Sequence, residues 1–337
     1  MNNPSADNKF EELKKCVYCT SENISYLFSA PNRFDKGNEI FSVSRCNNCD
    51  IVFQNPRVKS QYIEEYYTDT LGYYHPGVYK DTFSKRIKLF ITKNVLVNHF
   101  KYFNLGNKSF LIKLISFVFK RKLKIKMIPD YVEQGRVLDI GCSHGALLQE
   151  LRGYGWEVKG LEVHKKSAEY AQSLGLDVYQ STVEGIDFPD NHFNSIIMGM
   201  VLEHLHEPFE SLKKITKWIK PKGQLIFSIP YFNGFEFTIF REYCYGLQLP
   251  HHIVFLNKKV IEEYLKKIGY KNIRFYFQYF DRDVVTSAGY KYSEKGGFVN
   301  KILSSNKVVR YLLIKPAVYL MSYFHKTSRV TVYAEKC

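Results

Sequence analysis

The sequence predicts an α/β protein built on a doubly wound sheet, with parallel strands inside and helices on both faces. Three observations predict this class. Strand-like and helix-like segments alternate from residue 136 onward, which is typical of parallel sheets. A glycine-rich turn at residues 141–145 follows the first strand of the series. The ends of successive strands carry side chains that can line one cleft, so we expect a ligand site at the carboxyl edge of the sheet.

The alternating segments can be assigned in order along the chain. The series begins with strand RVLDI, helix GALLQELRGYG, strand EVKGLEV, helix KKSAEYAQSLG and strand LDVYQ. It continues with strand FNSIIMGM, helix EPFESLKKITKWIK, strand QLIFSIP, helix NKKVIEEYLKKIGY, strand NIRFYFQYF and a last strand, RVTVYA. Short apolar runs with β-branched residues predict the strands, and apolar residues three or four apart predict the helices.

Changes in residue composition and pattern along the chain predict five segments. Residues 1–58 carry four cysteines and short β-like runs, which predicts a small β-rich domain. Residues 59–132 are rich first in tyrosine and then in lysine, and predict a helical linker or lid. We expect the doubly wound domain at residues 133–280, a basic helical insertion at residues 281–328, and the final strand of the main sheet at residues 329–337.

Composition limits the class of protein. The 337 residues, 45% of them hydrophobic, suffice for one large core or two modest ones. Seven cysteines are too few for a disulfide scaffold, and the polar first residues hold no secretory apolar segment, so we expect a cytoplasmic protein. The apolar stretches at residues 110–119 and 311–324 are shorter than the ~20 residues that a membrane span needs.

The formal net charge of +15 is concentrated in two segments. Residues 80–126 contain thirteen Lys and Arg against one acid, Asp81, and residues 301–329 contain six against none. Leu, Ile, Phe and Tyr are interleaved with the charges in both segments. Such segments suit an anionic membrane surface or a nucleic acid, and they also suit an ordinary solvated helix face.

The glycine-rich turn indicates which ligand the cleft holds. A dinucleotide fingerprint requires G-x-G-x-x-G, but Ser143 stands at the middle position, between Gly141 and Gly145. Asp139, at the end of the preceding strand, suits a cationic amino acid better than a phosphate. Glu162 ends the second strand, where a carboxylate can bind both ribose hydroxyls. The ligand that combines these two parts is S-adenosylmethionine.

Four motifs in order make the chain resemble the class I S-adenosylmethionine-dependent methyltransferases: DIGCSHG, GWEVKGLEV, FPDNHFNSIIMGMVLEHLHEP and KPKGQLIFSIP. The resemblance covers residues 136–279 and implies a Rossmann-like methyltransferase sheet. It implies that Asp139, Gly141 and Gly145 hold the methionine part and that Glu162 binds the ribose. The expected cofactor-binding residues are Asp139, Gly141, Cys142, Ser143, Gly145, Glu162, Val163, Met198 and Met200, with Thr182, Val183 and Glu184 at the adenine edge. A Rossmann-like domain that has lost catalysis is the alternative.

Two matched cysteine pairs predict a metal site within residues 1–58. Cys16-x2-Cys19 and Cys46-x2-Cys49 can each present two thiolates from one tight turn to a tetrahedral ion. Because four sulfur ligands complete the coordination shell of Zn²⁺, we expect a structural zinc ion in a zinc-ribbon-like domain. Disulfides or an empty site are the alternatives.

The region before the methyltransferase motifs extends the resemblance. The run of CVYC, RCNNCDIVFQNPR and EEYYTDTLGYYH resembles bacterial methyltransferases with an N-terminal zinc ribbon, many of which modify sugars or surface polysaccharides. This implies a small-molecule or lipid-linked sugar acceptor in polysaccharide biosynthesis. The basic helices fit peripheral contact with an anionic membrane, at its inner face. The alternative is an RNA-binding protein or RNA methyltransferase, although MGMV after the fourth strand is not the (N/D)-P-P-(Y/F) of amino-methylating nucleic-acid enzymes.

Two histidines and a tyrosine are the expected catalytic residues, because methyl transfer to a hydroxyl or a carbon acid needs a positioned base. His204, in VLEHLHEP, follows the fourth strand, and His252, in LPHHIVFL, resembles a family histidine on the acceptor side. Either can be the base, or His252 only hydrogen-bonds backbone. Tyr74 closes over the cofactor or stacks on a sugar, or packs on the domain. Met200 replaces an acid of the divalent-metal set in some related O-methyltransferases, which argues against a catalytic metal.

Overall fold

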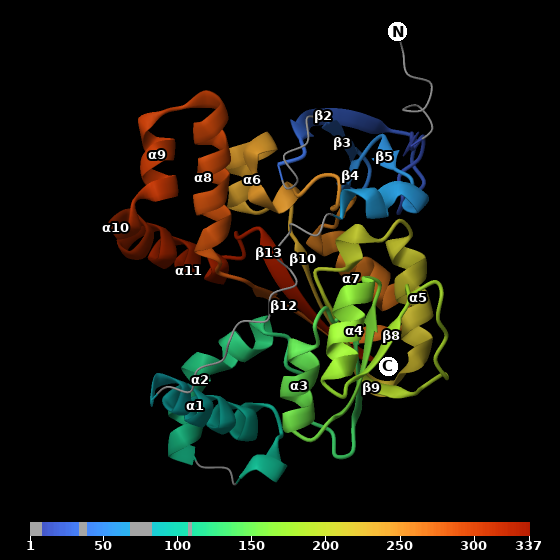
Figure 1. The fold of residues 1–337 in the computed structure, drawn as a ribbon, viewed down its shortest axis with the longest axis vertical. Coiled ribbons are helices and arrows are strands. Elements are labelled where there is room, and N and C mark those ends of the chain that lie inside the picture. Colours follow the sequence, from blue (N-terminus) through green and yellow to red (C-terminus); the bar gives the residue numbers. More distant parts are fainter. Residues whose placement is uncertain (1–8, 34–38, 68–82, 107–109) are drawn as a thin grey trace.

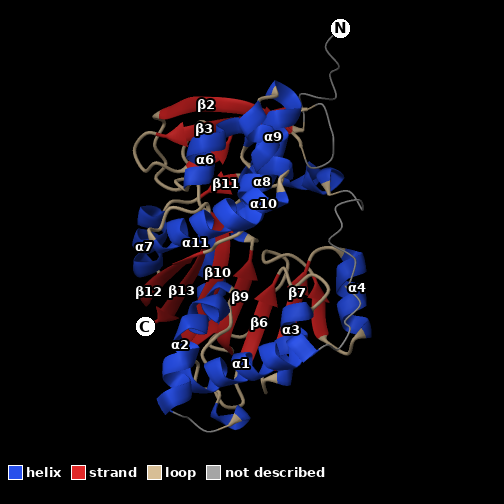
Figure 2. Cartoon of the chain, turned by 90° about the vertical axis from the view of Figure 1, so that its left-hand side faces the viewer, coloured by secondary structure: helices blue, strands red, loops and turns tan. Residues whose placement is uncertain are grey.

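Figure 1 shows the computed structural model, which describes residues 9–33, 39–67, 83–106 and 110–337. A small sheet with its helices occupies the upper part of the view, and a larger sheet lies below it. The two parts meet at the carboxyl edge of the larger sheet, where its parallel strands end (Figure 2). This edge is where the sequence predicts the ligand site.

The larger sheet has seven strands in the order β12-β13-β10-β9-β6-β7-β8. Their bounds are β6 (Arg136–Ile140), β7 (Glu157–Glu162), β8 (Asp177–Gln180), β9 (Phe193–Gly199), β10 (Ile219–Pro230), β12 (Tyr270–Phe277) and β13 (Arg329–Lys336). Strands β8, β7, β6, β9 and β10 pair in parallel, as predicted. The expected fold class, a Rossmann-like methyltransferase sheet, is confirmed.

Strand β13 departs from the predicted parallel arrangement. It lies between β10 and β12 and runs antiparallel to both. The Tyr231 N–H, just after β10 ends, donates to the carbonyl of Ser328 at 2.7 Å. The chain therefore returns to the sheet at the edge where β10 ends, so β13 must run back down the sheet.

Helices cover both faces of this sheet because neighbouring strand residues point to opposite sides. Leu138 of β6 packs with helices α5 (Pro208–Trp218) and α7 (Lys258–Lys267), whereas Val137 packs with α3 (Ala146–Gly153), α4 (Lys165–Ser173) and α1 (Phe83–His99). Helix α5 shows why: its buried side chains recur three residues apart, which forms one apolar stripe. They are Phe209, Leu212, Ile215 and Trp218.

The smaller sheet has the order β11-β4-β3-β2. Strands β2 (Ile24–Pro31), β3 (Ile40–Cys46) and β4 (Val52–Gln54) come from the N-terminal segment, and β2 and β3 coincide with predicted runs. Strand β11 (Val254–Phe255) comes from far along the chain and pairs with β4, so that Val254 lies opposite Phe53. A separate pair joins β1 (Phe10–Glu11) to β5 (Arg57–Val58), and a 3-10 helix, η1, spans Ser60–Tyr66.

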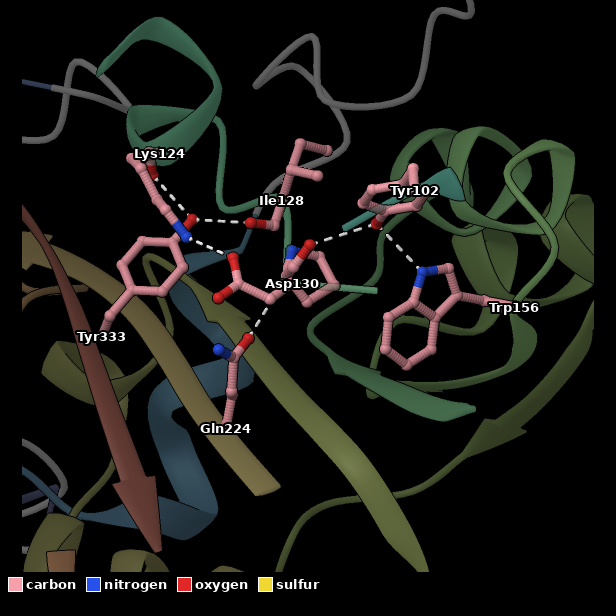
Figure 3. Close-up of polar contacts among 8 residues, drawn as sticks. Tyr102, Lys124, Ile128, Asp130, Trp156, Gln224 and Tyr333 are labelled. Atoms are coloured by element: carbon pink, nitrogen blue, oxygen red, sulfur yellow. Dashed lines mark hydrogen bonds and ion pairs between the residues drawn. The ribbon is translucent and has the colours of Figure 1, made fainter. Parts of the chain in front are cut away.

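The helical segment before the main sheet is attached to it by a buried polar network (Figure 3). The indole N–H of Trp156 donates to the Tyr102 hydroxyl at 3.0 Å, and that hydroxyl donates to the Pro129 carbonyl at 3.1 Å. The Tyr333 hydroxyl lies 3.0 Å from the carbonyl oxygens of Lys124 and Ile128. These bonds fix the end of helix α2 (Phe110–Ile125) against β13.

Lys124 is buried, in contrast to the other lysines of the predicted basic segment whose burial the structure describes. Its ammonium group lies 4.3 Å from the ring centroids of both Phe100 and Tyr333 and 2.9 Å from Asp130. Burial lowers the pKa of Lys124, and Asp130 opposes that shift. Lys124 therefore contributes to packing and not to the surface charge expected of residues 80–126.

The segment before β13 is helical, as predicted. It contains α8 (Asp281–Lys295), α9 (Phe298–Ser305), α10 (Lys307–Val309), the π-helical turn η7 (Arg310–Ile314) and α11 (Lys315–Tyr323). Short helices α6 (Phe235–Phe240) and η6 (Tyr245–Leu247) connect it to the small sheet. Within the described residues, no helix has the length and apolar character required to cross a membrane.

Candidate functional site

The glycine-rich turn after β6 has the geometry of a ligand-binding loop. Gly141 and Gly145 lie in the left-handed region, with φ of +72° and +79°. A Cβ atom at Gly141 would come within 2.5 Å of Val201, and one at Gly145 would clash with Leu176, so both positions exclude larger residues. Ser143 also has a positive φ, +49°, and keeps the turn at the position where the family commonly has glycine.

Two carboxylates lie at the ends of β6 and β7. Glu162 accepts the backbone N–H groups of Ser143 and His164 through its two oxygens, each at 2.8 Å, and so holds the turn in place. Asp139 is buried, and burial together with the nearby Glu162 charge raises its pKa to about 8. A carboxylate oxygen accepts more than one hydrogen bond, and two adjacent acids favour a cation. This set of acceptors therefore fits the ammonium and ribose groups of S-adenosylmethionine.

The other predicted cofactor residues lie along the same edge of the sheet but differ in how far their side chains are buried. Val183 and Met198 are buried in the core, and Cys142 is buried beside Gly160, so the side chains of all three pack inside the protein. Val163 is 57% exposed directly after β7. The remaining positions lie at loops after β8 and β9: Thr182 accepts the Gly185 N–H at 3.1 Å, Glu184 accepts the Ser211 hydroxyl at 2.9 Å, and Met200 has φ +58°.

A cluster of Glu203, His204 and His252, in which His204 is half-buried and the other two are buried, lies just after β9. Its potential ligand atoms all lie within 4.8 Å of one another. His252 Nε2 is 3.8 Å from Glu203 Oε1, and both side chains are 1% exposed. The Ile253 N–H donates to the Glu203 carbonyl at 2.9 Å, which joins the two segments. The structure therefore brings together both predicted histidines and adds Glu203 as their neighbour.

The cluster is electrically neutral near pH 7. Burial raises the pKa of Glu203 to about 8 and lowers the pKa of His204 to about 3. Burial also lowers the pKa of His252 well below its usual value. His252 Nδ1 donates to the Gly246 carbonyl at 2.8 Å, so its Nε2 carries the lone pair toward Glu203. His252 thus makes the backbone hydrogen bond that was weighed as the alternative to catalysis.

Tyr67 is a residue of the site that sequence analysis did not assign. Its hydroxyl lies 2.9 Å from His204 Nδ1, and its ring packs edge-on against His251 at 4.7 Å between centroids. His251 Nε2 donates to the Tyr66 carbonyl at 2.8 Å and so holds the end of η1 against the cluster. The tyrosine-rich run is the sequence feature that could have indicated Tyr67. The predicted catalytic tyrosine of that run, Tyr74, lies outside the described residues.

The four predicted cysteines also form one cluster. Cys16 Sγ lies 3.5 Å from Cys49 Sγ, Cys19 Sγ lies 3.5 Å from Cys46 Sγ, and all four sulfurs are within 4.8 Å. A tetrahedral zinc ion with Zn–S bonds of ~2.3 Å spaces its sulfurs by about 3.8 Å. The spacing of these sulfurs therefore fits one tetrahedral zinc ion.

Each cysteine pair is shaped by the same turn. The residue after each pair, Thr20 or Asp50, has a positive φ and donates its N–H to the carbonyl of the first cysteine, at 3.1 Å and 2.9 Å. The cluster is also attached to the main domain. Asn257 caps helix α7 by accepting the Val260 N–H at 2.9 Å, and its amide donates to the Cys49 carbonyl at 2.8 Å.

Comparisons with known proteins find similarity to methyltransferases. Residues 107–274, about half of the chain, match the Methyltransferase domain family. An uncharacterized protein of Methanocaldococcus jannaschii, MJ1123, is 26% identical over 154 residues, which are 45% of this chain and 73% of that protein. The ubiquinone biosynthesis O-methyltransferase of Vibrio cholerae is 33% identical over 100 residues, 28% of this chain and 41% of its own length. A crystal structure of an S-adenosylmethionine-dependent methyltransferase from Archaeoglobus fulgidus covers 65% of this chain and 99% of its own, with 18% identity and a TM-score of 0.44.

The chain thus contains a class I S-adenosylmethionine-dependent methyltransferase domain, with the predicted parallel strands and the glycine turn in place. The predicted enzyme class, an S-adenosylmethionine-dependent methyltransferase, is confirmed at the level of this domain. The chain spans about two fifths of the length of the ubiquinone relative.

Proposed function

We propose that this protein transfers a methyl group from S-adenosylmethionine to a sugar acceptor used in surface polysaccharide biosynthesis. The observation that carries the proposal is the neutral His204, bonded to the Tyr67 hydroxyl at 2.9 Å, at the end of β9. Val201, two residues before Glu203, packs against Gly141 of the cofactor turn. A base of this kind beside the cofactor suits an acceptor that must lose a proton.

His204 acts as the base in this scheme. Bound S-adenosylmethionine supplies an electrophilic methyl group, and the acceptor oxygen takes that group as the carbon–sulfur bond breaks. The acceptor proton moves toward the Tyr67 hydroxyl, and His204 Nδ1 receives the proton that Tyr67 releases. Because burial keeps His204 neutral, its lone pair is available at pH 7.

Glu203 and His252 position this base. Neither Glu203 oxygen has a hydrogen-bond partner among the described residues, and burial raises its pKa to about 8. A protonated Glu203 can donate to the lone pair at His252 Nε2, 3.8 Å away, after a small movement. That bond would hold the His252 ring, which packs edge-on against His204 at 4.8 Å between centroids.

A cavity of about 450 Å³ supports a phosphate-linked sugar as the acceptor. It is lined by apolar and aromatic residues together with two arginines, Arg45 and Arg241. Phe232, in its wall, packs at 5.8 Å from Phe255, whose ring lies 6.2 Å from His252. Arginines pair with phosphate oxygens in two-pronged geometry, so the cavity suits the phosphate of a nucleotide-linked or lipid-linked saccharide.

The cysteine cluster holds a structural zinc ion in this proposal. Cys16 and Cys46 are buried in the same core as α5 and α7. An ion there would fix the small sheet, and through β11 it would fix His252, two residues before that strand begins. We place the protein in the cytoplasm, with peripheral contact at the inner membrane face.

A phenolic acceptor is the second candidate, because the Vibrio cholerae relative is named a ubiquinone biosynthesis O-methyltransferase. A third, RNA methylation, follows from the basic segments. Calorimetric titration of the zinc-replete protein with S-adenosylmethionine comes first, with Asp139→Asn and Glu162→Gln as controls. Methyl transfer from labelled cofactor is then measured on nucleotide sugars, a dihydroxyphenol and total RNA. Labelling of nucleotide sugars alone supports the proposal, and labelling of the phenol or RNA alone overturns it.

A further inference from the structure

The helices before β13 carry an unusually apolar outer surface. Among the described residues, 25 large hydrophobic side chains are exposed, and ten of them lie within residues 298–324. The exposed side chains of residues 298–326 are called here the C-terminal helical surface. Its hydrophobic members are Phe298, Val299, Val308, Tyr311, Leu312, Leu313, Tyr319, Leu320, Tyr323 and Phe324.

Only a narrow stripe of this segment packs on the protein. In residues 307–323, the buried side chains are Ile314, Val318 and Ser322, one in every four residues. Leu312 and Leu313 are 69% and 63% exposed. A helix that is apolar on its outer side as well as its inner side is ordinarily buried against something. An uncovered surface of this kind marks an interaction site.

The charge of the surface is entirely positive. Residues 295–334 contain no Asp or Glu, and the surface includes the basic residues Lys301, Lys307, Arg310, Lys315 and Lys326. The only acid that any of these contacts among the described residues comes from α8, where Asp281 lies 2.5 Å from Arg310. Lys315 lies 4.0 Å over the Tyr311 ring. The surface therefore presents aliphatic, aromatic and cationic groups together.

A second basic segment, far away in the sequence, lies beside this surface. Arg121 of α2 donates to the Ser322 hydroxyl at 2.8 Å and stacks 4.1 Å over the Tyr323 ring. Four residues earlier, Phe117 is 64% exposed. Figure 2 shows α1, α2, α10 and α11 on the same side of the molecule. The structure thus joins the two basic segments on one face.

We infer that this face binds the surface of an anionic lipid bilayer, with the apolar side chains inserted at the headgroup level and the lysines among lipid phosphates. Both the exposed apolar side chains and the basic side chains of this face are accounted for by this partner. Apolar side chains gain free energy by leaving water, and each Lys or Arg near an anionic surface adds about 1 kcal/mol. The inference rests on the membrane contact given in the proposed function and names the face that makes it, and it holds whatever the acceptor is.

Charge excludes a second copy as the better occupant. A two-fold interface places the same patch on both sides, so two copies would bring five cationic side chains against five. RNA fits less well for a different reason. It would pair with the lysines and stack on the aromatic rings, but Leu312, Leu313 and Leu320 would stay in water.

The surface is connected to the candidate active site through α8. The Tyr245 N–H donates to the hydroxyl of Ser287, in α8, at 2.8 Å, and the next residue, Gly246, accepts from His252. Asp283 of α8 binds Arg329 at 2.7 Å, at the start of β13. Binding a bilayer through this surface would therefore orient the acceptor side of the site relative to the lipid.

The test is flotation of the full-length protein with vesicles. One set contains phosphatidylglycerol in phosphatidylcholine, and the other is phosphatidylcholine alone. We expect binding to the anionic vesicles, weakened by salt, and at least tenfold weaker binding to the neutral ones. The variant Leu312→Glu with Leu313→Glu should lose binding by about tenfold or more, because it removes two inserted leucines. The pair Lys301→Glu with Lys307→Glu should lose about fivefold for each lysine.

Matched controls separate this loss from misfolding. Ile40→Glu changes an exposed apolar residue of the small sheet, 70% exposed, and should bind as the unaltered protein does. Lys213→Glu with Lys217→Glu makes the same charge change on exposed positions of α5, at the right of Figure 1, and should lose less. Thermal unfolding should be similar for the helix variants, because Leu, Lys and Glu have similar helix propensities.

Three results would overturn the inference. One is absence of flotation with anionic vesicles. Another is equal loss in the surface variants and their controls. The third is a concentration-dependent dimer, or an RNA complex, that forms without vesicle binding and is abolished by the Leu312→Glu and Leu313→Glu changes. Cofactor titration on the same samples would show whether the methyltransferase site is intact, so a failure of membrane binding is distinguishable from a failure of the proposed activity.

Discussion

The two clusters of potential metal ligands in this protein arise in opposite ways. The four sulfurs of Cys16, Cys19, Cys46 and Cys49 come from two local turns of the same shape, and the spacing of the cysteines in the sequence predicts the cluster. The cluster of Glu203, His204 and His252 is assembled from two loops 48 residues apart in the chain and is neutral because it is buried. The comparison shows that two clusters with similar distances between their ligand atoms can suit different chemistry. Four sulfurs suit a metal ion, whereas a carboxylic acid with two neutral histidines suits proton transfer.

The largest expected effect concerns the sulfur cluster. Cys19→Ser with Cys46→Ser should remove zinc and unfold the small sheet, because structural zinc contributes about 10 kcal/mol or more to the folding of small metal domains. Zinc content and thermal unfolding are the measurements. Cys337→Ser, which changes an exposed cysteine, is the control. One zinc ion per chain in the purified protein would support a metal at the cysteine cluster alone. Two per chain would place a metal at the histidine cluster as well, and none would contradict the zinc proposal.

The next effect tests the proton role of the second cluster. His204→Gln should lower kcat by about 10²- to 10⁴-fold, the range for loss of a general base, with the affinity for S-adenosylmethionine unchanged. Tyr67→Phe should lower kcat by about tenfold, because a water molecule can carry the proton in place of its hydroxyl. His192→Gln, at the opposite edge of the sheet, is the control. A large loss of cofactor affinity in His204→Gln would show that this residue binds and does not catalyse.

A smaller effect concerns the cofactor carboxylates. Because the pKa of Asp139 is about 8 without ligand, the cationic amino group of S-adenosylmethionine must displace a proton from it. Affinity should therefore rise with pH between 6.5 and 8, by up to about tenfold per pH unit. Asp139→Asn should bind weakly and lose this dependence, as calorimetry at several pH values will show. A flat profile in the unaltered protein would contradict the role given to Asp139.

The last expected effect is on stability. Glu203 in the folded protein holds its proton up to about pH 8, whereas the unfolded chain releases it near pH 4.5. The folded state binds more protons in that window, so its stability falls as pH rises, by up to about 1.4 kcal/mol per pH unit. Glu203→Gln should reduce the fall in melting temperature between pH 5 and 8. An unchanged slope would mean that Glu203 is ionised and paired with a protonated His252.

Local patterns predicted the main sheet well. The glycine turn, the acidic strand ends and the alternation of strand and helix are properties of neighbouring residues, and the strands β6 to β10 lie where these patterns placed them. Strand β13 was found as a strand, but its antiparallel direction was not predicted. That direction depends on where the helices before it return the chain to the sheet, which no local pattern records.

At the histidine site, too, local sequence patterns predicted some residues, and tertiary contacts decided how they meet. His204 and His252 were expected from their motifs, but their meeting with Glu203 depends on the Ile253–Glu203 backbone bond and on β11 pairing with β4. Tyr67 is one tyrosine among many in its segment, and its contacts with His204 and His251 distinguish it. The basic segments were counted as charge, yet Lys124 is buried between two rings.

The sequence by itself determined the elements of the domain, the cofactor turn and the cysteine knuckles, because hydrophobic period, glycine conformation and short ligand spacing act within a few residues. The tertiary structure alone decided which loops meet at the active site, which charged groups are neutralised, and which apolar side chains stay in water. Those outcomes depend on burial and on contacts between distant segments, and pKa values and exposed surfaces exist only after the chain has packed.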